Sequence, residues 1–136
     1  MTKLPEKVMD LLNHPDSTKI VATKTPKGDV HAIIVGSVRS PDPETIIFGT
    51  LIMHKTSENL REMCRKGELA SVLVVKGMIS YEVRAKVREQ RVEGKELEKM
   101  NAQLEPMGLK MTSVWYLEPV EVYDQSASYQ AGTRMV

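Results

Sequence analysis

The spacing of apolar residues changes its period along the chain, and each period predicts one kind of element. Residues 81–87 alternate Tyr, Val, Ala and Val with charged residues, which predicts a strand with one buried face. Residues 45–50 are almost wholly apolar and predict a strand covered on both faces, after a break at Pro41-Asp42-Pro43. Four more apolar or β-branched segments, at 18–25, 30–38, 69–75 and 110–123, bring the expected number of strands to six.

Apolar residues recur at helical spacing in three stretches. They predict helices over 5–12, from Thr56 or Ser57 to 66, and over 93–107. Because strands and helices do not alternate regularly, we expect a mainly β protein, with an antiparallel sheet closed into a small barrel and helices at its ends. Residues 1–136 are expected to form a single domain. Its polar tail over 124–136 either reaches a partner subunit or is disordered.

Composition narrows the classes of function. The 136 residues, 41% hydrophobic and 27% charged, suit one packed domain. A net charge of +1 and an aromatic content of 4% argue against binding of nucleic acid. The single cysteine, Cys64, excludes an internal disulfide and a multi-cysteine zinc site. There is no apolar run of membrane-spanning length and no signal-peptide pattern, so we expect a cytoplasmic protein that does not bind membranes.

Common sequence motifs of nucleotide binding and catalysis are absent. The chain has no Gly-x-Gly-x-x-Gly, no Gly-x-x-x-x-Gly-Lys and no Gly-x-Ser-x-Gly. The histidines are scattered without ligand spacing, so no metal site is expected. No acid–base pair stands out, and the catalytic residues stay unassigned.

The segment 48–60 carries the most informative chemistry, because a strand ends there and a helix begins. The free backbone N–H groups and the dipole of a helix start attract anions. Lys55 adds a positive charge beside them, while Thr56 and Ser57 add hydroxyl donors. Two interpretations stay open: a phosphate-binding site, or an ordinary capped helix whose lysine is solvated.

Two further patterns allow both a functional and a structural interpretation. Gly49 and Gly36 lie inside predicted strands, where glycine marks either the close approach of a ligand or backbone, or a bulge. A basic face is formed by Arg84, Lys86, Arg88 and Arg91. It is either an anion-binding stripe or, as we favour, a charged surface balanced by neighbouring glutamates.

The order of several short motifs resembles a known family. These motifs are Ile46-Ile47-Phe48-Gly49-Thr50, Met53-His54-Lys55-Thr56, Asn59-Leu60 and Ser80-Tyr81-Glu82-Val83-Arg84. Together they resemble the flavin mononucleotide (FMN)-binding split barrels, the pyridoxamine 5'-phosphate oxidase-like proteins. The resemblance extends over roughly 4–123. It implies a six-stranded antiparallel split β-barrel with about three helices, which forms a homodimer with FMN near the subunit interface.

The resemblance also implies roles for particular residues. Lys55 and Thr56 would contact the FMN phosphate, with His54 beside them. The ribityl chain and ring would run along Gly49, Thr50, Leu51 and Met53, opposite a wall formed by Val35, Gly36 and Ser37. Asn59 is a further candidate, and Trp115 would face the flavin of the partner subunit.

The implied function is that of a flavin-dependent reductase or electron-transfer protein with a small-molecule electron donor or acceptor. The chain lacks the arginine-rich substrate segments of the family's oxidase, which argues against oxidation of pyridoxamine phosphate. Two alternatives stay open: the same fold with a deazaflavin coenzyme or haem, and a non-enzymatic binding module that uses the basic face.

Overall fold

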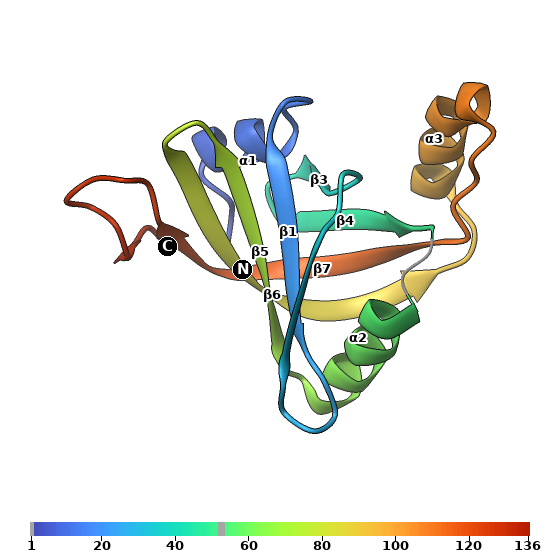
Figure 1. Cartoon of the computed structure of the whole chain (residues 1–136), viewed down its shortest axis with the longest axis horizontal. Helices are drawn as coiled ribbons and strands as arrows, with labels where there is room; N and C mark the ends of the chain where they lie inside the picture. The colour runs from blue at the N-terminus through green and yellow to red at the C-terminus, as the bar shows by residue number, and fades with distance from the viewer. Residues whose placement is uncertain (1, 52–53) are drawn as a thin grey trace.

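The computed structural model describes residues 2–51 and 54–136 and contains one antiparallel sheet with three α-helices (Figure 1). The strands are β1 (Thr18–Lys24), β2 (Val30–Ile34), β3 (Arg39–Asp42), β4 (Thr45–Thr50), β5 (Leu69–Lys76), β6 (Ile79–Arg91), β7 (Ser113–Asp124) and β8 (Thr133–Arg134). The helices are α1 (Glu6–Leu12), α2 (His54–Lys66), α3 (Lys95–Leu104) and the 3-10 turn η1 (Glu105–Met107).

The strand order is β2-β1-β5-β6-β7-β4-β3, with β8 paired to β7. The long strand β6 belongs to both halves of this sheet, because it pairs with β5 on one side and β7 on the other. Its pairing with β7 shifts register between Arg84 and Ala85 and again between Val87 and Glu89. Such irregularities bend a strand. In Figure 1, β6 turns from the direction of β5 into that of β7, so the sheet curves around its core.

The apolar strand β4 is covered on both faces, as its sequence predicted. Ile46 and Phe48 point into the main core, which α1 and α2 help to close. Ile47 points the other way, into a smaller cluster with Leu97, Met100, Met111 and Val114. This second cluster holds α3 against β4 and β7. Figure 1 shows α3 standing at one end of the molecule, on the outside of these strands.

The sheet has more strands than the six expected. The Pro-Asp-Pro sequence does not only break the chain, because Pro41 lies within the short strand β3. β3 is an edge strand whose pairing with β4 shifts register between Arg39 and Asp42, and a proline is tolerated at such a place. β2 ends at Ile34 rather than near residue 38, since the Val35 N–H still donates to the Lys19 carbonyl but the chain then crosses toward β3.

The C-terminal tail folds back on its own chain and adds the short strand β8, so it is ordered rather than disordered, while its contact with a partner subunit stays a prediction. β7 extends past the end of β4 and leaves one edge free at Tyr123 and Asp124, where β8 pairs. The Met135 N–H donates to the Val122 carbonyl over 2.7 Å.

The helices match their predicted places with shifted ends. α2 begins at His54 rather than at Thr56 or Ser57, and α3 stops at Leu104, where η1 takes over. Across the described residues, no helix is long and apolar enough to span a membrane.

Candidate functional site

A cavity of about 760 Å³ lies between the β2–β3 connection, the end of β4, and α3. Its wall includes three residues that the sequence placed opposite β4, namely Val35, Gly36 and Ser37, together with Gly49 and Leu51. The structure therefore brings these five candidates together around one space. A Cβ added to Gly36 would meet nothing within 4 Å, so that side of the cavity is open.

Ser37 fixes the position of the β2–β3 connection. Its hydroxyl accepts the Gly49 N–H at 2.9 Å and lies 3.3 Å from the Gly49 carbonyl, to which it donates. A side chain thus replaces the missing strand-to-strand pairing between this connection and β4. The consequence is a defined width for the cavity between the two segments.

The opposite side of the cavity is apolar and belongs to α3 and the segment after it. Met100, Leu104 and Met111 line it. A Cβ on Gly49 would lie 1.8 Å from the Met111 sulfur and 2.9 Å from that of Met100. Gly49 therefore leaves room for the close approach of methionine side chains, which neither of the two sequence-based interpretations of this glycine included.

A second cavity, of about 470 Å³, lies beside the start of α2. Thr50, His54, Ser57 and Arg61 are among its lining residues, and Leu51 lines both cavities, so the two adjoin. Arg61 is held here by a hydrogen bond from its Nε to the Gln90 Oε1 at 3.4 Å. The Gln90 amide donates in turn to the Ser113 hydroxyl at 2.8 Å, and that hydroxyl lies 2.6 Å from Thr50 Oγ1.

Sequence reasoning missed Arg61, Gln90 and Ser113. The spacing of His54, Ser57 and Arg61, at i, i+3 and i+7, does place them along one helix face. Gln90 and Ser113 lie in strands, and nothing local in the sequence connects them to α2.

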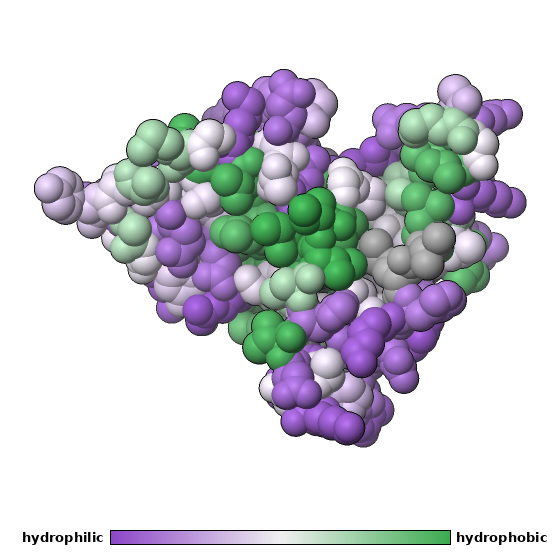
Figure 2. All heavy atoms as spheres, viewed as in Figure 1, coloured by the Kyte–Doolittle hydropathy of each residue, from purple (hydrophilic) through white to green (hydrophobic). Residues whose placement is uncertain are grey.

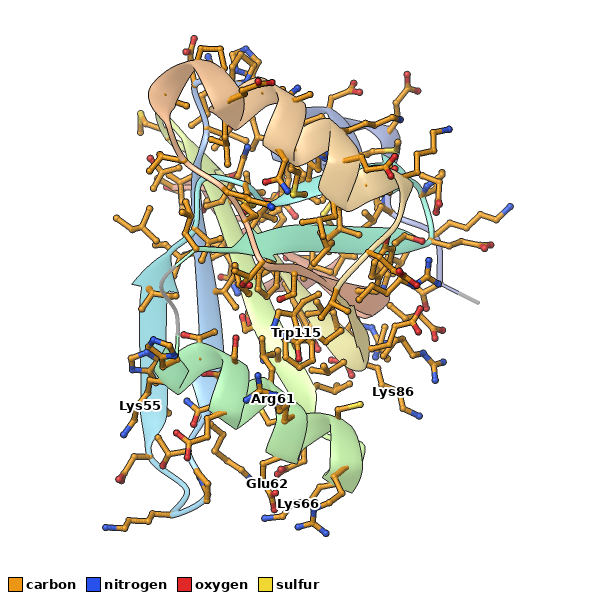
Figure 3. The ribbon with its side chains drawn as sticks, turned by 90° about the vertical axis from the view of Figure 1, so that its right-hand side faces the viewer. Lys55, Arg61, Glu62, Lys66, Lys86 and Trp115 are labelled. Atoms are coloured by element: carbon orange, nitrogen blue, oxygen red, sulfur yellow. The ribbon has the colours of Figure 1, made fainter. Side chains whose placement is uncertain are left out.

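The first turn of α2 carries two exposed and two buried candidates. His54 and Lys55 are exposed, while Thr56 and Ser57 are buried. Figure 3 shows Lys55 at the start of the helix and Arg61 further along it, nearer to Trp115. Among the described residues, Lys55 and Thr56 line neither cavity, so a ligand at this helix start would meet the Lys55 side chain at its solvent side. Met53, the remaining candidate of this segment, lies outside the described residues.

By sequence, the chain matches no family model and no curated protein. By structure, it is similar to an FMN-binding protein from Syntrophomonas wolfei subsp. wolfei, with a TM-score of 0.78 and 16% identity over 90% of this chain and 86% of that one. HupZ of Group A Streptococcus gives a TM-score of 0.76 at 18% identity, over 95% and 99% of the two chains. A protein of the pyridoxinephosphate oxidase family from Clostridium acetobutylicum gives 0.64 at 11% identity, over 97% and 94%.

The chain has the split-barrel fold. The resemblance inferred from the order of its sequence motifs is confirmed at the level of this fold.

Two of the residues carried over from the resemblance are part of the split barrel's interior. Trp115 is only 2% exposed and packs in the main core, where its indole N–H donates to the Ser57 hydroxyl at 3.3 Å. Its ring cannot face a partner's flavin from there. Asn59 is 1% exposed, and its amide donates to the Thr23 hydroxyl at 3.1 Å, which ties α2 to β1. Both residues therefore hold α2 against the interior of the barrel.

Three of the four residues of the basic face, Arg84, Arg88 and Arg91, are paired with glutamates, which agrees with the favoured interpretation. Arg84 forms ion pairs with Glu82 and Glu121 at 3.5 Å each, and Arg88 pairs with Glu118. Arg91 pairs with Glu89, and the hydrogen bond to this carboxylate raises the pKa of the Arg91 guanidinium above its ordinary value, although desolvation opposes the shift. Within residues 2–51 and 54–136, no group of three or more metal-ligating side chains occurs.

The larger cavity has a charged end away from α2. Lys19, only 7% exposed, and Arg39 both line it. Burial, and to a smaller degree the positive charge of Arg39, lower the pKa of Lys19 below its ordinary value of 10.5. This end played no part in the sequence-based prediction.

Proposed function

We propose that the protein binds FMN across the two adjoining cavities and acts as a flavin-dependent oxidoreductase or electron-transfer protein. The observation that supports this best is the position of Leu51, which lines both the cavity at the start of α2 and the large apolar cavity. A ligand with an anionic end and a flat apolar end fits such a pair of spaces.

The phosphate group is proposed to bind at the first turn of α2. Backbone N–H groups there have no partner within the helix, and the helix dipole favours an anion. Lys55 and His54 are exposed beside this turn, and Ser57 and Arg61 line the adjoining cavity. Thr56 is 1% exposed, so its contribution is the backbone N–H rather than the hydroxyl. Charge-assisted hydrogen bonds of this kind orient a phosphate strongly.

The flavin ring is proposed to occupy the larger cavity. Its volume of about 760 Å³ lies in the range of sites for small molecules and cofactors, roughly 300–1,000 Å³. Val35, Gly36 and Ser37 form one wall and the methionines of the α3 region the other. Gly49, Thr50 and Met53 are proposed along the ribityl chain. When bound, the flavin supplies hydride or electron transfer, while the chain's own residues bind it and exclude water.

The deazaflavin and haem alternatives stay part of the proposal. An F420 reductase has a similar fold, with a TM-score of 0.63 and 16% identity over 88% of this chain and 98% of that one. The anion-binding helix start suits any phosphate-bearing flavin analogue equally. The identity of the ring must therefore be decided by its absorption.

A homodimer is proposed because an apolar face continues from the rim of the larger cavity. Ile34 is 73% exposed and lines the cavity, and in the sheet it lies opposite Ile20, which lies opposite Leu73. Figure 2 shows apolar side chains gathered at the centre of this face of the molecule. A second copy seated on it would cover both the apolar row and the open side of the cavity.

The decisive experiment is an absorption spectrum of the purified protein, before and after addition of FMN, deazaflavin coenzyme and haem in separate samples. The proposal expects a flavin spectrum and FMN binding at micromolar concentration or tighter. Reduction of the bound flavin is then tested with NADH and with NADPH. Lack of binding to FMN, with binding of one of the other two, would replace the cofactor but keep the site.

A cytoplasmic location is part of the same proposal. The described chain has one free cysteine, Cys64, which suits a reducing compartment.

A further inference from the structure

Lys19 is a buried lysine without a partner in the structure. It lies in β1, is only 7% exposed and lines the larger cavity. Over residues 2–51 and 54–136, its ammonium group has no hydrogen bond and no carboxylate within 4.0 Å, and it keeps some contact with solvent although the residue as a whole is buried. A buried charge is costly unless it is paired. A lysine kept in this state, and turned toward a cavity, indicates that its counter-ion comes from a ligand.

Arg39 adds to the positive charge at this end but has already found a partner. Its guanidinium lies 3.2 Å from Glu96, which comes from α3. Lys19 and Arg39 are the charged side chains among the described residues that line the cavity, and no acidic side chain lines it. Because the negative charge of Glu96 offsets the positive charge of Arg39, the charge of Lys19 leaves a net charge of +1 at this end of the cavity. That charge matches a monoanion better than a phosphate dianion.

We propose that Lys19, assisted by Arg39, binds the carboxylate of a small organic acid, the second ligand that meets the flavin in this cavity. The position of that acid beside the flavin rests on the function proposed above, whereas the anion-binding end stands on Lys19 itself. Much of the rest of the wall, with Val38, Leu104 and Met111, is apolar, although Asn13, Ser37 and Gln103 also line the cavity. It suits an acid whose carboxylate is attached to an apolar or aromatic body. Such an anion would neutralise the ammonium group and relieve the effects that lower the pKa of Lys19.

The FMN phosphate itself is a poor occupant for this end. In the sheet, Arg39 lies opposite Ile47 of β4. Leu51, next to the start of α2, follows Ile47 by four residues, so along an extended chain the two anion-binding places are separated by about 13 Å. One phosphate cannot occupy both. If the FMN phosphate binds at the start of α2, Lys19 remains available to bind a different anion.

The test uses benzoate as the probe and benzamide, its uncharged analogue, as the control. FMN-loaded protein is titrated with each, and the change in flavin absorbance is recorded. We expect benzoate to perturb the spectrum at lower concentration than benzamide. In Lys19→Met, benzoate binding should weaken about tenfold or more, as for loss of a charged hydrogen-bond partner. Lys19→Arg keeps the charge and should restore much of the binding.

Two controls separate this role from a general one. Lys27→Met removes an exposed lysine in the β1–β2 turn and should leave benzoate binding unchanged. Thermal unfolding of Lys19→Met establishes that the variant is folded. FMN affinity should change by less than about threefold in Lys19→Met, because the phosphate binds elsewhere. Unchanged benzoate binding in this variant, or a large loss of its FMN affinity, would overturn the proposal.

The experiment also distinguishes failure of the proposed function from failure of this inference. If the wild-type protein binds no FMN, the flavin-free protein is titrated with benzoate by calorimetry. Binding that disappears in Lys19→Met then supports the anion-binding end without a flavin. Absence of benzoate binding in both forms of the wild-type protein refutes it, whatever the cofactor.

Discussion

Trp115 and Ser57 are joined across 3.3 Å, with the indole N–H of β7 donating to the hydroxyl in the first turn of α2. Both residues are buried, at 2% and 6% exposed. The hydrogen bond fastens the start of α2 to the interior of the barrel. The helix start that is proposed to bind phosphate is therefore held in place by the core.

We predict that Trp115 and Ser57 are energetically coupled. Trp115→Phe leaves the Ser57 hydroxyl without its donor, and Ser57→Ala leaves the indole N–H without its acceptor. Each should lower the free energy of unfolding by about 1–3 kcal/mol, and a double-mutant cycle should give a coupling of about 0.5–1.5 kcal/mol. Urea denaturation measures both values. Strict additivity of the two substitutions would show that the hydrogen bond contributes nothing.

Lys55→Ala is predicted to weaken FMN binding by about 1.5–3 kcal/mol, because it removes a charged partner of the phosphate. The matched control is Lys66→Ala, which removes a lysine from the other end of the same helix, where it pairs with Glu62 at 3.6 Å (Figure 3). Fluorescence titration with FMN compares the two. Equal affinities for Lys55→Ala and Lys66→Ala would remove Lys55 from the site.

Gly49→Ala is predicted to destabilise the protein by about 1 kcal/mol, the low end of overpacking effects, since the new methyl group forces the flexible Met111 side chain to move. Gly36→Ala is the control, because its Cβ meets no atom within 4 Å; its effect on stability should stay below about 0.5 kcal/mol. Chemical denaturation gives both numbers. Adding Met111→Ala to Gly49→Ala should remove most of the collision, so the double variant should lose less stability than the two single variants together. A loss equal to the sum of the two single losses would contradict this explanation.

Ile34→Asp is predicted to convert the proposed dimer into a monomer, because it buries a charge in the apolar row of the interface. Val92→Asp changes a residue with the same exposure, 73%, that lies outside that row and should leave the mass unchanged. Light scattering after size-exclusion chromatography, with FMN present, reports the mass. A wild-type protein that elutes as a monomer under these conditions would exclude the dimer.

The lowered pKa of Lys19 predicts a dependence of stability on pH. Because the folded-state pKa lies below the ordinary 10.5, the folded chain releases this proton at a pH where the unfolded chain still holds it. The free energy of unfolding therefore rises with pH through that window and its gain is complete above 10.5. Lys19→Met removes the effect. Denaturation curves of both proteins are measured from neutral pH to about pH 10. Over this range the free energy of unfolding of the wild type should rise relative to that of Lys19→Met.

Much of the fold was predictable because it depends on local patterns. The alternation in β6 and the apolar run in β4 each identify a strand and its buried face, and both were confirmed. The end of β2 was not predictable in this way. The apolar residues that follow Ile34 continue the strand pattern, but the chain leaves the ladder in order to reach the edge strand β3.

The site was less predictable than the fold, since its parts meet only through tertiary structure. Trp115 has an aromatic side chain of the kind that can pack against a flavin ring. Only the packing of α2 against β7 shows that its indole is enclosed. Lys19 is one polar residue among several in its segment. It lines the cavity together with Arg39, which lies twenty residues further along the chain. Long-range burial of a charged group leaves no local signal.

The hydrogen bonds between Ser37 and Gly49 have a consequence for how this part of the protein would recognise a ligand. They lie where the chain itself joins the two edge strands of the sheet, β2 and β3. Beyond Val35, whose N–H and carbonyl are engaged, the peptide groups of this connection belong to no strand ladder. For the proposed flavin, recognition there falls to main-chain donors and acceptors, which every sequence possesses. Such a site would tolerate wide replacement of the side chains along this connection.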